Sequence, residues 1–315
     1  MALTKVSNNM LVQPVNHNIL INPSFTVKQR GDVVEHTEDS FGPDRWSVRG
    51  KSNVGGTKVE SSTRVDDVTG VNKLVVTHEG TTASYTYANQ FIEAVNIRGL
   101  YGKEMTLSFG YSDTGGSGIP RVRVWSWDSS DDTKKIYEEV PTSLGNNRWT
   151  CTFTLSTKDG TVPDPSGIGM QVAIYANEIN NAPSEWSVWE TKLEAGSVVT
   201  PFIARQYGEE LSLCQRYYQV FGIDHVFAGR GGSTTTMAVS VVPFVELRAT
   251  PTIPSSVSAR AYSVNGATSN TTSTLTLSKY TSAAYITFAG FNSVLTDNRV
   301  GSVQLAQAMP VDAEL

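Results

Sequence analysis

Apolar and polar residues alternate with a period of two along much of residues 72–194, a pattern typical of β-strands that bury one face. Segments rich in Gly, Asn, Asp and Ser separate these runs, and no helical periodicity lies between them. Short strands joined by frequent turns indicate an antiparallel β-sandwich. We expect its strands at 72–78, 83–92, 104–112, 119–127, 148–155, 168–176 and 186–194.

The periodicity changes once, after the last of these strands. Leu211, Cys214 and Tyr218 are spaced at i, i+3 and i+7, which places them on one face of a helix. Two glutamates precede them in the first turn, where the helix dipole favours negative charge. The pattern therefore predicts a short helix over 209–219 and a domain boundary near residue 205.

Alternation resumes after this helix and predicts a second, smaller β-sandwich, so the fold class is all-β. Pro243 lies inside one of the apolar runs and indicates an edge strand or a bulge there, because proline cannot donate a ladder hydrogen bond. The strands of this second domain are expected at 220–228, 235–247, 258–265, 272–279, 283–289 and 301–309.

Composition limits the classes of function. At 315 residues the chain suits two domains, each able to bury a core. Lys and Arg total 25 against 30 Asp and Glu, and the net charge of −5 argues against general nucleic-acid binding, which needs a positive surface. The chain contains no run of 18 apolar residues, so the sequence predicts no membrane span. The N-terminal sequence lacks the basic and apolar regions of a secretory signal.

The two cysteines, Cys151 and Cys214, fall in different predicted domains. Cys151 alternates with threonines along its strand and Cys214 shares the apolar helix face, so both are expected to be small buried residues. Assembly in a reducing cytosol disfavours a disulfide. We expect two thiols per chain when thiols are counted under denaturing, non-reducing conditions.

Signatures of metal binding and proteolysis are weak. The four histidines show no metal-ligand spacing and none lies near a cysteine, which argues against zinc. Asp113-Thr114-Gly115 matches the tripeptide of aspartic proteases, but that chemistry needs two such carboxylates and the chain has one copy. The histidines are His17, His36, His78 and His225.

Glycoside hydrolysis is the enzymatic alternative that stays open. It requires two carboxyl groups about 5–10 Å apart across a cleft. The run DSSDD at 128–132 more simply makes a solvated hairpin turn. Its acids could hold Ca²⁺ through hard oxygen ligands, but the spacing matches no EF-hand loop, so we expect no cofactor. Because no pair of these acids can be assigned as general acid and base, we expect no enzymatic activity. The candidate acids are Asp128, Asp131, Asp132, Glu138 and Glu139.

The aromatic residues favour binding. Along 119–127, small residues such as Val122 and Val124 alternate with two arginines and two tryptophans, so an aliphatic core face opposes an Arg/Trp face. Aromatic rings pack on the C–H face of a sugar while Arg, Asn or Asp bond its hydroxyls. Two tyrosines on the strand expected to be adjacent have the same spacing. The predicted glycan-binding residues are Arg123, Trp125, Trp127, Tyr85 and Tyr87.

A second interpretation of Trp125 and Trp127 stays open at this point. They could cover the second sheet face, or contact the C-terminal domain or a neighbouring chain, because large aromatic side chains are usually structural. The other tryptophans singled out, Trp46, Trp149 and Trp186, are assigned mainly to the core.

Several segments carry a resemblance to a known group of proteins. KLEAGSVVTPF, then YGEELSLCQRYYQV, then VPFVELRATPTI at 242–253 are similar to a segment shared by many tail-fibre and receptor-binding proteins of tailed bacteriophages. VDAEL at 311–315 resembles the end of such chains. NILINPSFTVKQRG and FGPDRWSV resemble the start of the carbohydrate-binding-module-like jelly roll that precedes this segment. The resemblance covers most of residues 18–315 and implies architecture more firmly than activity.

The resemblance implies an attachment or stalk-end peptide at 1–18, a jelly-roll carbohydrate-binding-like domain at 19–205 and a C-terminal β-sandwich at 206–315. It also implies a non-enzymatic virion protein, a tail-fibre or receptor-binding subunit that binds host-surface polysaccharide or lipopolysaccharide. Its N-terminus would join other virion tail proteins. We expect a homotrimer that is assembled in the host cytoplasm and released by lysis, with no nucleic acid or membrane span. Two alternatives stay open, a structural fibre or head-decoration protein without its own ligand and a glycan depolymerase.

Overall fold

The computed structural model divides into two compact units, Met1–Glu210 and Leu211–Leu315. The structure describes residues 18–31, 33–36, 40–50, 58–79, 86–114, 118–176, 184–231, 236–241, 245–249, 251–263, 268–278, 284–289 and 300–314.

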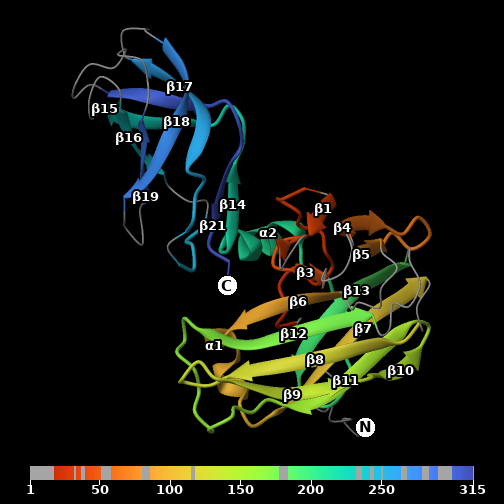
Figure 1. Cartoon of the computed structure of the whole chain (residues 1–315). Coiled ribbons are helices and arrows are strands. Elements are labelled where there is room, and N and C mark those ends of the chain that lie inside the picture. The colour runs from red at the N-terminus through yellow and green to blue at the C-terminus, as the bar shows by residue number, and fades with distance from the viewer. Residues whose placement is uncertain are drawn as a thin grey trace, which may run out of the picture. The chain divides into compact units, whose positions relative to one another are not determined.

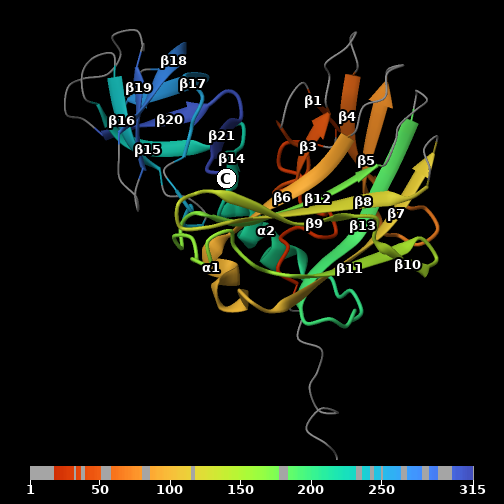
Figure 2. The ribbon, with the colours of Figure 1, turned by 60° about the horizontal axis from the view of Figure 1, so that its bottom comes forward.

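The first unit is an antiparallel β-sandwich of two sheets (Figure 1). The first sheet has the strand order β1 (Val33–His36), β4 (Lys58–Val65), β5 (Asn72–Glu79), β13 (Ser184–Ala195), β7 (Glu104–Thr114), β11 (Arg148–Thr154) and β10 (Thr142–Gly145). The second sheet has the order β2 (Ser40–Phe41), β3 (Ser47–Gly50), β6 (Thr86–Glu93), β12 (Ile168–Ala176), β8 (Pro120–Trp127) and β9 (Thr133–Glu139). Figure 2 shows β5, β13 and β7 running side by side in the first sheet.

The core lies between the two sheets and follows the period-two alternation of the sequence. Val122 and Val124 of β8 are fully buried, as predicted, while the residues between them are only partly buried. The largest enclosed side chains of the cluster include Trp46 and Trp186. Trp149 packs against the same cluster while remaining partly exposed. The sequence assignment of these three tryptophans to the core is therefore confirmed.

Two features of the first unit differ from the prediction. A short helix α1 (Ala94–Ile97) and a 3₁₀ turn η2 (Arg98–Leu100) connect β6 to β7, where no helix was expected. Ala94 and Ile97 are buried, and Gly169 of β12 leaves the room that the helix needs, since a Cβ there would overlap Ala94. The edge strands β1, β2, β9 and β10 and the neighbouring strand β4 were also missed. On β9 and β10, little burial leaves little alternation.

The helix that opens the second half of the chain is shorter than predicted. α2 spans Tyr207–Gln215, with Glu209 and Glu210 in its first turn as expected. Tyr218 does not continue it. It begins strand β14 (Tyr218–Phe221), which pairs with β21 (Met309–Asp312), so pairing with a distant segment decides the conformation of a residue whose spacing suggested helix.

The second unit is all-β, but it is not the second sandwich that we predicted. Six of its strands close into a barrel, because each strand finds a partner on both sides and no edge of the sheet is left open. The order is β15 (Val226–Gly231), β16 (Thr236–Val241), β19 (Ala284–Ala289), β18 (Thr268–Ser278), β17 (Ser256–Ser263) and β20 (Val300–Leu305). Pro243 lies outside the described residues.

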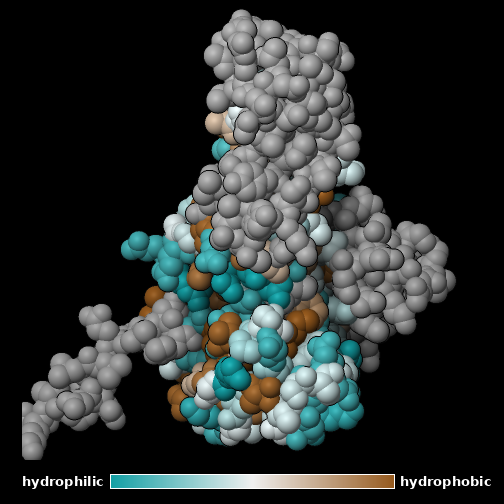
Figure 3. All heavy atoms as spheres, turned by 90° about the vertical axis from the view of Figure 1, so that its left-hand side faces the viewer, coloured by the Kyte–Doolittle hydropathy of each residue, from teal (hydrophilic) through white to brown (hydrophobic). Residues whose placement is uncertain are grey.

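Further expectations concern single residues and the surface. Cys151 and Cys214 are both buried and form no disulfide, as expected. Within the part of the chain that is described, no helix is long and apolar enough to cross a membrane. Among the described residues on the face drawn in Figure 3, hydrophobic and hydrophilic residues are interspersed, as on an ordinary protein surface.

Candidate functional site

The site lies on the outer face of the second sheet, and strand β8 determines which side chains reach it. Along β8, buried and partly buried residues alternate without interruption. Since Val122 and Val124 point into the core, Arg121, Arg123, Trp125 and Trp127 point to the outer face. The sequence predicted this division of the strand, and the structure agrees.

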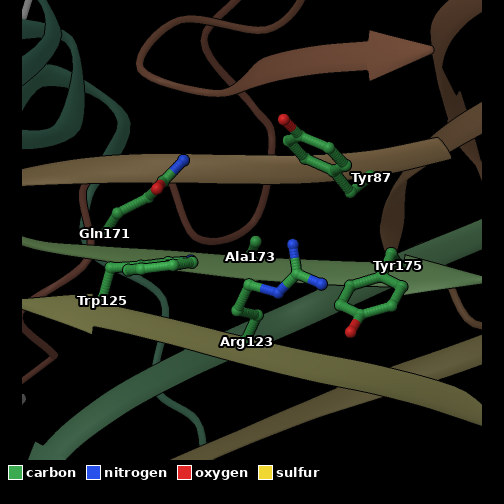
Figure 4. A pocket seen from close by; sticks show the side chains of 6 residues that line it. All are labelled: Tyr87, Arg123, Trp125, Gln171, Ala173 and Tyr175. Carbon is green, nitrogen blue, oxygen red and sulfur yellow. The ribbon is translucent and has the colours of Figure 1, made fainter. Parts of the chain in front are cut away.

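An open pocket of about 320 Å³ of free space, part of it open to solvent, is hollowed into this face. Its lining comes from three neighbouring strands, β6, β12 and β8. Figure 4 shows Trp125 on one side of Arg123 and Tyr175 on the other, with Tyr87 across the pocket. The six lining residues are Tyr87, Arg123, Trp125, Gln171, Ala173 and Tyr175.

The strand register explains why a hollow forms here. β12 pairs with β6 on one side and with β8 on the other. Ala173 is the Cα partner of Arg123, and Gln171 is the partner of Trp125, so all four side chains share one face. An alanine surrounded by large side chains ends at Cβ and leaves free space above the sheet. Ala173 thus forms the floor, and the aromatic residues form the walls.

Arg123 is held in place by an ion pair from the neighbouring edge strand. Its Nε donates to Glu138 Oε1 at 2.8 Å, and its Nη2 donates to the same oxygen. Lys135 also donates to Glu138. The hydrogen bond from Lys135, and after it that from Arg123, holds the pKa of Glu138 below its usual range despite the opposing effect of burial. Glu138 is therefore ionised at neutral pH.

The arginine also contacts an aromatic wall of the pocket. Its guanidinium carbon lies 5.4 Å from the centroid of the Tyr175 ring, within the range of a cation–π interaction. Two independent contacts, one polar and one aromatic, therefore fix the same side chain. A fixed cation beside aromatic walls loses little conformational entropy when it binds a ligand.

The structure gathers two of the five predicted residues around Arg123 and leaves a third, Trp127, outside the pocket. Trp125 and Tyr87 line the pocket with it. The expectation that the tyrosine strand adjoins β8 is wrong, because β12 lies between β8 and β6, and Tyr87 reaches the pocket from the far side of β12. Trp127 packs edge-on against Phe91, with ring centroids 6.1 Å apart, and does not line the pocket. Tyr85 lies outside the described residues.

Three lining residues were missed by the sequence analysis. Gln171, Ala173 and Tyr175 alternate with Val172 and Ile174 along β12. The same alternation that revealed the outer face of β8 was available here. What the sequence did not reveal is that β12 lies directly beside β8, since about 40 residues of chain and three other strands separate them.

Three of the five acids considered for hydrolysis take structural roles. Asp128 Oδ1 accepts hydrogen bonds from the backbone nitrogens of Ser130 and Asp132 at 3.0 Å each, which fixes the β8–β9 turn. Asp132 pairs with Lys158, and Glu138 pairs with Arg123. Among the described residues, no group of three His, Cys, Asp or Glu side chains could hold a metal ion.

Comparisons with known proteins give only distant structural similarities. No protein-family model and no curated protein sequence matches the chain. Among solved structures, an enzymatically active domain of tailspike protein 4 from bacteriophage CBA120 is 12% identical with a TM-score of 0.32, and the match covers 57% of this chain and 21% of that one. The match thus spans about a fifth of that solved domain.

Two carbohydrate-binding modules of Clostridium thermocellum are similar to the same extent. The C-terminal family 22 module of Xyn10B is 15% identical, with a TM-score of 0.35, over 60% of this chain and all of that one. A family 11 module in complex with a β-1,3-1,4-mixed-linked tetrasaccharide is 20% identical, with a TM-score of 0.28, over 52% of this chain and 94% of that one. At these scores the likeness carries no conclusion about the fold or the ligand of this chain.

Proposed function

We propose that the first unit binds a glycan in the pocket on the outer face of its second sheet, without cleaving it. One observation carries this proposal: two polar side chains, the ion-paired Arg123 and Gln171, stand among three aromatic ones around an alanine floor. Aromatic rings pack on the C–H face of a sugar, and the arginine and the amide supply hydrogen bonds to hydroxyls. Because the ion pair with Glu138 holds Arg123 before a ligand arrives, binding needs little rearrangement.

We further propose that the protein serves as a tail-fibre or receptor-binding subunit of a phage virion, and that the glycan belongs to the host surface. The resemblance of residues 186–220 and 242–253 to such proteins supports this role. Three copies would be related by cyclic symmetry. Light scattering would then give three times the 34.1 kDa of one chain, and the mass of one chain would contradict the trimer.

The test of glycan binding uses two tryptophans from the same strand and the same face. Trp125→Ala removes a wall of the pocket and should weaken binding of the purified protein to host cells by about 1–3 kcal/mol, as for other aromatic anchors. Trp127→Ala is the matched control, because Trp127 packs on Phe91 and lines no part of the pocket. It should leave binding within a factor of two or so of the parent.

Three outcomes would decide against this function. Equal loss of binding in both variants, together with a large fall in melting temperature, would mark the tryptophans as packing. Parent protein that binds no host cells would favour a structural fibre or decoration protein. Release of reducing sugar from host polysaccharide would favour the depolymerase.

A further inference from the structure

The net charge of the side chains around the pocket is positive, whereas the net charge of the whole chain is negative. Arg123 is the single charged residue among the six that line the pocket. Glu138 balances it, but Lys135 shares that same carboxylate. The three side chains together therefore carry a net charge of +1, on a chain whose net charge is −5.

A second arginine adds to this excess. Arg121 precedes Arg123 by two residues on β8, so it points to the same outer face, beside its Cα partner Tyr175. Its Nε is buried and has no hydrogen-bond partner in the described part of the chain. Arg121, Arg123, Lys135 and Glu138 together therefore carry a net charge of +2 beside the pocket.

The ion pair leaves part of Arg123 available to a ligand. Both hydrogen bonds to Glu138 use Nε and Nη2, so Nη1 stands outside the pair. About a third of the Arg123 side chain is exposed, at 32%, and Figure 4 shows its guanidinium extending toward the space between Tyr87 and Tyr175. A partly desolvated guanidinium is the side chain that best recognises carboxylate and phosphate groups.

We propose that the pocket prefers an acidic sugar, one that carries a carboxylate or a phosphate, over the neutral sugar of the same shape. This preference rests on the proposed glycan binding. The sugar ring packs against Trp125, and its anionic group points toward Arg123. A neutral hydroxyl gains a hydrogen bond from the guanidinium, whereas an anion also gains from the excess of positive charge on this face.

The preference is measured with the full chain and immobilised oligosaccharides in matched pairs. Oligogalacturonate is compared with oligogalactose, oligoglucuronate with oligoglucose, and galactose 6-phosphate with galactose. The acidic member of at least one pair should bind about tenfold more tightly at 50 mM NaCl. This ratio should shrink several-fold at 500 mM NaCl, where the Debye length is about 4 Å and charges further apart are screened from each other. The carboxylate and phosphate pairs distinguish the two sources of charge.

Two substitutions outside the lining change the charge while leaving the walls intact. Glu138→Gln keeps a hydrogen-bond acceptor for Arg123 but removes the negative charge, and it should raise the acidic-to-neutral ratio three- to tenfold. Lys135→Gln acts on a side chain that is 46% exposed, and it should lower the ratio by a similar factor. Both variants are compared with the parent by melting temperature.

Each outcome counts for or against the preference. Equal binding of both members of every pair, or substitutions that change both members alike, overturns the acidic preference. Glycan binding still stands in that case if Trp125→Ala weakens it. Binding of free inorganic phosphate as tightly as of the phosphorylated sugar also overturns it. Binding of no member of any pair overturns both the preference and the proposed function.

Discussion

The outer faces of the two sheets of the sandwich each carry a partly buried tryptophan, and the two are held differently. On the first sheet, Trp189 of β13 lies across from its Cα partner Gly110 of β7, and a Cβ at Gly110 would overlap the indole ring. Lys73 places its ammonium group 4.6 Å from the centroid of the same ring. Glycine on one side and lysine on the other therefore enclose this indole.

On the second sheet, Trp125 has Gln171 and Lys135 as its cross-strand partners. Both partners carry long side chains, so the indole of Trp125 does not lie against the sheet backbone as the indole of Trp189 does at Gly110. The nearby Ala173 leaves a hollow beside the Trp125 ring. The comparison teaches that a tryptophan on a sheet face does not by itself mark a binding site. The size of the side chains on the neighbouring strands decides whether the ring is packed or open.

The largest expected effect is a difference in stability between the variants Trp189→Ala and Trp125→Ala. Trp189→Ala should cost about 3 kcal/mol, the lower end for a tryptophan cut to alanine, because it removes the contacts with Gly110 and Lys73. Trp125→Ala should cost less than about 1 kcal/mol, because its ring borders an open pocket. Chemical denaturation of both variants measures the difference. Equal costs would remove the distinction between the two faces.

A smaller effect tests the close approach of Trp189 to the backbone. Gly110→Ala introduces a methyl group where the indole lies and should cost about 1–3 kcal/mol, as overpacking does. The melting temperature should fall by roughly 3–10 °C. In a Trp189→Ala background the same substitution should cost almost nothing, because its obstacle is gone. An undiminished cost in the double variant would show that the strain lies elsewhere.

A larger side chain in the pocket of the second sheet should reduce binding more than stability. Ala173→Leu fills the hollow above the floor, so glycan binding should weaken about tenfold, or 1.4 kcal/mol. Stability should change less than for Gly110→Ala, because a pocket lies above Ala173, whereas an indole ring lies directly over Gly110. Cell binding and the melting temperature are measured on the same preparation. A large fall in melting temperature with binding retained would contradict the open pocket.

The smallest effect concerns the charge that covers Trp189. A side-chain hydrogen bond from Lys73, and then bonds from Thr69, hold the pKa of Asp66 well below the usual 3.8. Since the folded-state pKa is depressed, the stabilisation is present above pH 3.8 and is lost as the pH falls below it. Asp66→Asn should flatten this part of the melting-temperature profile slightly. A profile identical to the parent would show that solvent screens the pair completely.

Much of the fold follows from local pattern. The alternation along β8 and β12 reflects burial of one strand face, and it predicted both strands within a residue or so of their ends. The helix prediction placed Tyr218 wrongly, because β14 gains its hydrogen bonds from β21, some 90 residues further along the chain. Local spacing carries no information about such a partner. For the same reason the closure of the barrel in the second unit did not appear in its sequence.

The sequence by itself determined which side chains stand on the outer face of β8, because alternation forces Arg123, Trp125 and Trp127 to one side whichever side that is. Only the tertiary structure decided which of them share a pocket. Strand order placed β12 between β8 and β6, which brought Ala173 beside Arg123 and Tyr87 across from it, while Trp127 met Phe91. The physical reason is that period and polarity are properties of one strand. A hollow depends on the sizes of side chains from several strands at once.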